Sequence, residues 1–170
     1  MSNHAAEVAQ QLLDRGKYQV PIDVHQVAND IGLVVVEQDL EDQVSGLLVI
    51  KGNTGTIGVN ANHHINRQRF TIAHECGHYM LHRDDTRVFI DAVPVFFRAD
   101  VPVVASSSQE IDANNFAAAL LMPKLKLQEL LRAQPVDAFD EVALRRLANL
   151  FGVSTQALTI RLTRLNLISF

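Results

Sequence analysis

The chain has 170 residues, of which 48% are hydrophobic and 20% charged, and its net charge at pH 7 is −4. This length and composition indicate one globular domain with a core of its own, and exclude a largely disordered chain. The acidic balance excludes a nucleic-acid binder that is basic over its whole surface. A single cysteine excludes an internal disulfide framework, and no segment resembles a secretory leader or a membrane span. We therefore expect a cytoplasmic protein without membrane contact.

The first third of the chain predicts two helices followed by a small sheet. Apolar residues recur at helical spacing over residues 4–15 and again over 23–31. Runs rich in apolar and β-branched residues then predict three strands, with turn chemistry before the last. These strands cover residues 33–36, 44–50 and 56–60. We expect them to form an antiparallel sheet.

The remaining two thirds predict helices. A long helix over 65–82 precedes a stretch, 83–108, that has no clear period and is expected to be a loop. The helices predicted after it cover residues 109–122, 124–133, 140–150 and 154–166. The whole chain, 1–170, is therefore predicted to be a single α+β domain that is mostly helical. Its catalytic core would occupy about 1–123, and a helical, helix-turn-helix-like subdomain about 124–170.

The long helix contains the pattern HExxH, from His74 to His78. Residues four apart on a helix lie about 40° apart around its axis, so both imidazoles can face one metal ion. Glu75 lies about 100° away from His74, where it cannot be a ligand beside the histidines but can reach the attacking water. This arrangement is typical of zinc peptidases, in which the glutamate is the general base.

The alternative is a surface helix that carries two ordinary histidines. Apolar residues around the motif argue against it, because they place the histidines in or beside a buried face, where imidazoles need partners. Gly77 costs about 1 kcal/mol in a helix relative to alanine, which is easier to explain if another element packs closely there. Cys76 lies about 200° from His74 and is predicted to be a buried apolar thiol rather than a nucleophile.

A catalytic zinc ion needs a third protein ligand and one open position. The acidic candidates downstream are Asp84, Asp85, Asp91, Asp100, Glu110 and Asp112. Helical geometry favours Glu110, because it shares a face with Ala113, Ala117 and Leu121, and a carboxylate on an apolar face needs a cation. The alternative is a capping box in which Ser107 begins the helix and Glu110 is its third residue.

Two segments resemble the signatures of a known family. The sequence RFTIAHECGHYMLH, residues 69–82, resembles the motif helix of the ImmA/IrrE family of metallo-endopeptidases. The sequence EIDANNFAAALLMP, residues 110–123, resembles that family's second signature, E-x-x-A-N-x-F-A-A-x-L-L-M-P. Weaker similarity extends the likeness over about residues 20 to 165. Cys76 is a departure, because the family more often has leucine there.

The resemblance implies a zincin-like fold in which the small sheet lies over the motif helix. It also implies that His74, His78 and Glu110 bind one divalent metal ion and that Glu75 is catalytic. Zinc suits this ligand set, and manganese or iron can also bind to it. In the family the edge of the sheet can hold the substrate as an added strand, and this implies an edge at Ser45, Gly46 and Leu47. Candidate donors to the oxyanion are Tyr79, His82 and Arg98, among which the sequence does not choose.

Relatives in this family cleave or inactivate helix-turn-helix repressors in phages, mobile elements and stress responses. Others are paired with an Xre-like partner in toxin–antitoxin loci. The resemblance therefore implies an endopeptidase whose substrate or partner is a helix-turn-helix repressor or antitoxin. The first alternative is a binding module that acts on such a partner by complex formation, without proteolysis.

A second alternative is a DNA-binding regulator. Residues 141–170 carry four arginines and one acidic residue, a local charge of +3, on helices spaced as in a helix-turn-helix. The arginines are Arg145, Arg146, Arg161 and Arg164. The simpler interpretation is a helical hairpin with solvated arginines, because similar segments occur within the peptidase family. We therefore expect no direct contact with nucleic acid.

Overall fold

The computed structural model describes residues 4–83, 88–92 and 107–168. Over these ranges the chain forms seven helices and four strands. The helices are α1 (His4–Gly16), α2 (Val24–Asp30), α3 (Ile65–His82), α4 (Ser107–Leu121), α5 (Lys124–Ala133), α6 (Glu141–Phe151) and α7 (Thr155–Arg164). The strands are β1 (Leu33–Gln38), β2 (Val44–Lys51), β3 (Thr54–Asn60) and β4 (Val88–Ala92). The predicted class, α+β and mostly helical, is confirmed.

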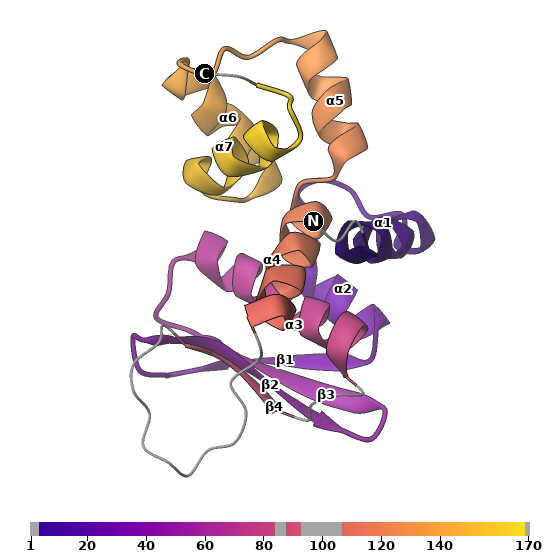
Figure 1. Ribbon diagram of the computed structural model, residues 1–170. Coiled ribbons are helices and arrows are strands. Elements are labelled where there is room, and N and C mark those ends of the chain that lie inside the picture. Colours follow the sequence, from indigo (N-terminus) through magenta and orange to yellow (C-terminus); the bar gives the residue numbers. More distant parts are fainter. Residues whose placement is uncertain (1–3, 84–87, 93–106, 169–170) are drawn as a thin grey trace.

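The elements are stacked in layers (Figure 1). The sheet forms one layer, α3 lies over it, and α4 crosses α3 on the side away from the sheet. Helices α5, α6 and α7 lie at the end of the molecule farthest from the sheet (Figure 1). The motif helix is therefore an inner element, packed between strands and a second helix. No helix in the described ranges combines the length and apolarity needed to cross a membrane.

Local signals explain where several helices begin and end. The carboxylate of Asp23 accepts hydrogen bonds from the backbone N–H groups of His25 and Gln26 at the start of α2. Ser154 caps α7 in the same way. Gly152 ends α6 in the left-handed conformation, with φ of 63°, which glycine adopts without strain. Both α3 and α5 begin and end at their predicted residues.

The sheet differs from its prediction in two respects. Its strand order is β1-β3-β2-β4, and β1 runs parallel to β3, so the sheet is mixed rather than antiparallel. It also has a fourth strand, β4, inside the stretch that was predicted to be a loop. Both differences arise because long-range pairing determines which strands are neighbours in the sheet. Strand β1 pairs with β3 and not with β2, which follows it directly in the sequence.

The predicted substrate edge at Ser45, Gly46 and Leu47 is wrong, because β4 pairs with β2 along this segment. Gly46 lies opposite Asp91 and Leu47 opposite Ile90, in an antiparallel ladder that is irregular around Ser45. Strand β2 is thus an inner strand with a neighbour on each side. Within the described residues, the edge on this side of the sheet is β4.

Two glycines let α3 approach its neighbours closely. A Cβ atom on Gly77 would lie 3.1 Å from the Cα of Ala113 in α4, which confirms the predicted close approach of a second element. A Cβ atom on Gly46 of β2 would clash with a side-chain carbon of Thr71 in α3. Larger residues at either position would push α3 away from α4 or from the sheet.

Candidate metal centre

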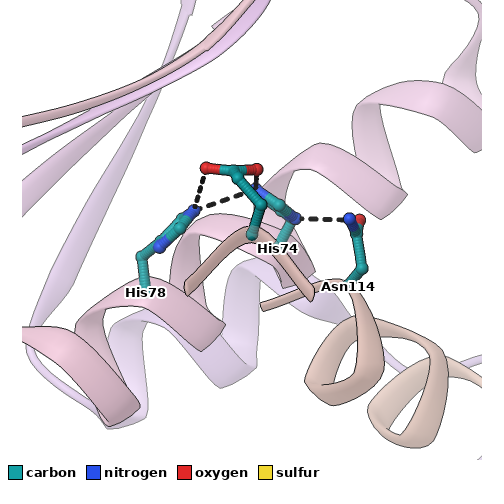
Figure 2. A network of polar contacts seen from close by, with 4 residues as sticks. His74, His78 and Asn114 are labelled. Atoms are coloured by element: carbon teal, nitrogen blue, oxygen red, sulfur yellow. Dashed lines mark hydrogen bonds and ion pairs between the residues drawn. The ribbon is translucent and has the colours of Figure 1, made fainter. Parts of the chain in front are cut away.

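The two histidines of the motif lie one turn apart on α3 and are both buried. Their Nε2 atoms are 3.0 Å apart, and Figure 2 shows the two rings directed toward one another. Helix α4 brings Glu110 to the same point. Its carboxylate oxygens lie 3.3 Å from the Nε2 atom of His74 and 3.2 Å from that of His78. The structure therefore brings together the three residues predicted to be ligands.

The donor atoms of this cluster are compatible with a bound metal ion. Imidazole nitrogens and carboxylate oxygens both present lone pairs, so protons or a metal cation must lie among them. The candidate ligand atoms of His74, His78 and Glu110 all lie within 4.8 Å of one another. Two imidazoles and one carboxylate are a donor set of catalytic zinc sites, with a fourth position left for water or substrate. The contacts of Glu110 with both rings favour a ligand over a helix cap.

Asn114 adjoins the cluster, although it was not among the site residues predicted from the sequence. Its Oδ1 atom lies 3.2 Å from the Nδ1 atom of His74, and Figure 2 shows it reaching His74 from α4. Because an amide oxygen only accepts hydrogen bonds, Nδ1 carries the hydrogen. With a metal ion bound, the neutral ring would then offer the lone pair of Nε2 as a ligand. The signal was available in the sequence, because Asn114 lies four residues after Glu110 and shares its helix face.

Burial and hydrogen bonding set the charges in the cluster. Burial disfavours the charged imidazolium and lowers the pKa of His78. Burial alone would raise the pKa of Glu110, but hydrogen bonds with His74 and His78 outweigh it and lower that pKa to about 2. The two shifts favour an ionised Glu110 and a neutral His78. These are the protonation states that metal ligands require.

Glu75 is fully buried beside His74, on the side of α3 that faces β2. One of its carboxylate oxygens lies 3.8 Å from the position that a Cβ atom on Gly46 would occupy. A side chain at position 46 would clash with the neighbouring Thr71, whereas this oxygen of Glu75 lies at ordinary van der Waals distance. Gly46 does not form a free strand edge. It provides the space in which the side chain of Thr71 packs against β2.

The three candidate oxyanion donors have different positions. Tyr79 is buried, and its hydroxyl donates to the backbone carbonyl of Asn53 at 2.9 Å, so it ties α3 to the β2–β3 turn and is wrong as an oxyanion donor. His82 is half-buried, with its ring centroid 6.0 Å from that of His78, and stays a candidate. Arg98 lies outside the described residues.

Cys76 is confirmed as a buried thiol. Its side chain is fully buried in the hydrophobic core, and burial raises the pKa of the thiol. A thiol that stays protonated is a weak nucleophile. Cys76 therefore contributes to the packing of the core and is not a candidate nucleophile.

The four C-terminal arginines do not share one environment. Arg145, Arg146 and Arg164 are exposed, but Arg161 is half-buried. The Nε atom of Arg161 donates to the backbone carbonyl of Met122 at 3.3 Å. Burial and the nearby charge of Arg164 lower its pKa. Arg161 thus connects α7 to the end of α4, so the DNA-binding alternative would depend mainly on the other three arginines.

Comparison with known protein families identifies the family of this chain. A family model described as the IrrE N-terminal-like domain, of peptidase family M78, matches residues 28–163. The chain belongs to this peptidase family. The matched range contains His74, Glu75, His78, Glu110 and Asn114. A comparison with curated proteins finds none that matches the chain. Family membership supports a peptidase activity, and the cluster supplies residues compatible with its metal site.

Proposed function

We propose that this chain is a metal-dependent endopeptidase. In this proposal His74, His78 and Glu110 hold one divalent ion, for which zinc is the best fit, and Glu75 is the general base. The observation that carries the proposal is the convergence of the three ligand side chains from α3 and α4. Membership of a peptidase family supports the same chemistry.

Each of these residues has a separate role in the proposed mechanism. A zinc ion in this donor set would polarise the scissile carbonyl and make water a nucleophile at neutral pH. The carboxylate of Glu75 accepts the proton of the attacking water and passes it to the leaving amine. His82 lies one turn beyond His78 on α3, with the two ring centroids 6.0 Å apart. It is our candidate for the donor that stabilises the oxyanion.

The proposed substrate is a helix-turn-helix repressor or antitoxin, which the chain would meet in the cytoplasm. This part of the proposal rests on the resemblance of the two sequence signatures to the ImmA/IrrE family. Strand β4 ends the sheet in the described part of the chain. We propose that a substrate segment adds to the sheet as a further strand along β4.

The test uses the full chain loaded with zinc. It is incubated with the helix-turn-helix repressor encoded nearest its own gene, with and without 1,10-phenanthroline, and the products are analysed by mass spectrometry. We expect fragments that the chelator prevents and that added zinc restores. A stable complex without fragments, at full zinc occupancy, would contradict the endopeptidase and support the alternative binding module.

A further inference from the structure

A cavity of about 520 Å³ lies between the beginning of α3 and the beginning of α7. Its apolar wall is formed by Phe70 of α3 and by Val153 and Ala157 across from it. Polar side chains complete the lining: His64, Asn66, Arg67 and Ser154. This volume lies within the range of about 300–1,000 Å³ found for sites that bind small ligands. None of the metal-cluster residues forms part of this lining.

The cavity adjoins the metal cluster through Phe70. This residue lies one helical turn before His74, and the two rings are stacked with their centroids 6.4 Å apart. A side chain bound against Phe70 would thus lie one ring away from a predicted metal ligand. The cavity and the metal cluster therefore lie next to each other along α3.

The opposite wall is fixed by Arg69. Its Nε atom donates to the backbone carbonyl of Gly152 at 3.0 Å, and its Nη2 atom donates to that of Ile22 at 2.8 Å. A Cβ atom on Gly152 would lie 2.8 Å from the guanidinium, so the α6–α7 turn packs tightly here. Arg69 therefore holds Val153 and Ala157 opposite Phe70.

The rim of the cavity is connected to the sheet by Arg67. This side chain donates to the hydroxyl of Ser45 from Nε at 3.2 Å and from Nη2 at 2.7 Å. Ser45 lies at the irregularity where β2 pairs with β4. The contacts of Arg67 thus connect the cavity to α3 and to the part of β2 that pairs with β4.

Resting on the proposed function, we infer that this cavity is a specificity subsite for one large apolar side chain of the substrate. The side chain is leucine, methionine or phenylalanine, at a position that flanks the scissile bond. The apolar wall favours such a group, and the small Ala157 leaves room for it. The α6–α7 hairpin then serves as a wall of the substrate cleft.

The test compares the zinc-loaded wild type with Ala157→Phe, which fills the cavity, and with the matched control Ala133→Phe, on an exposed position of α5. Cleavage sites are first mapped in a proteome-derived peptide library. The values of kcat/KM are then measured for two peptides that differ only in leucine or alanine at the selected position. Melting temperature and zinc content verify that each variant is folded and loaded.

We expect the wild type to prefer the leucine peptide at least tenfold, the range over which apolar pockets discriminate. Ala157→Phe should lose this preference, and Ala133→Phe should keep it. Cleavage without an apolar preference, or a preference unchanged in Ala157→Phe, would overturn the inference.

A binding experiment separates this inference from the proposed function. Fluorescence anisotropy measures the affinity of the same labelled peptides for Glu75→Gln, which is expected to bind without cutting. Tighter binding of the leucine peptide, lost when Ala157→Phe is added, would support the subsite even if the wild type cleaves nothing. Equal binding of both peptides would overturn the subsite whatever the wild type cleaves.

Discussion

Helix α3 contributes to two regions that differ in how far they can be predicted from the sequence. Its second half carries His74 and His78, whose spacing of four residues by itself predicts a shared metal site. Its first half carries Arg69 and Phe70, which contact the α6–α7 hairpin or line the cavity beside it. The hairpin has the sequence pattern of a helix-turn-helix, and its residues Val153, Ser154 and Ala157 line the cavity. Local spacing identifies the first region, whereas the second is identified only by its tertiary contacts.

The largest effect should come from the metal region. Glu75→Gln removes the proton acceptor and keeps the shape of the side chain, so we expect cleavage to fall by about 10²–10⁴-fold. Zinc content and melting temperature should match those of the wild type, because Glu75 is not among the three predicted ligands. The rate is measured on the repressor under single-turnover conditions. Full activity in this variant would contradict the assignment of Glu75.

The next effect concerns Asn114, which orients His74. Asn114→Ala removes the acceptor for the Nδ1 hydrogen, and losing such a partner typically weakens metal binding by about 10–100-fold. Competition with a chromophoric chelator measures the zinc affinity. Asn114→Asp, which retains an acceptor, is the matched control and should bind zinc nearly as well as the wild type. An unchanged affinity in Asn114→Ala would show that His74 is oriented without this contact.

A smaller effect, confined to stability, is expected in the hairpin region. Arg69→Met keeps an apolar stem but removes the donors to the carbonyls of Gly152 and Ile22. We expect the free energy of unfolding to fall by about 2 kcal/mol. Hydrogen bonds from charged groups contribute about 1.5–3 kcal/mol each, and removing a partly buried charge offsets part of the loss of two of them. Urea denaturation of the zinc-loaded protein measures this change. Zinc stoichiometry should stay the same, and its loss would mean that the two halves of α3 are not separable.

The smallest effect should follow from the exposed arginines of α6. The double variant Arg145→Ala and Arg146→Ala removes no contact to the described core, so its stability should change by less than about 0.5 kcal/mol. Repressor cleavage should also be unchanged. Gel-shift assays with duplex DNA should show no binding by either protein. Salt-dependent binding by the wild type that this variant loses would favour the DNA-binding alternative.

The sequence predicted the parts of the structure that depend on local spacing. The range of α3, the shared face of His74 and His78, and the apolar face around Glu110 all follow from the period of a helix. Buried alanines at 113 and 117 confirm that face of α4. The close approach at Gly77 was also predictable, because a glycine inside a helix needs a packing reason.

The parts that depend on long-range pairing were missed. Strand β4 lies in a segment without a period of its own and becomes a strand by pairing with β2. For the same reason, the sequence could not show that Ser45, Gly46 and Leu47 lie inside the sheet. Tyr79 follows His78 directly, but it lies about 140° around the helix from His74 and therefore faces the sheet. Adjacency in sequence was a poor guide to its role.

The metal content of the protein tests the central claim most directly. Tag-free wild type and Glu110→Ala are reconstituted with zinc, desalted and analysed by elemental mass spectrometry. We predict close to one ion per chain in the wild type, because His74, His78 and Glu110 converge on one point. The stoichiometry should be lost or strongly reduced in Glu110→Ala. A wild type that retains no metal after reconstitution would contradict the account, and the binding-module alternative would then be favoured.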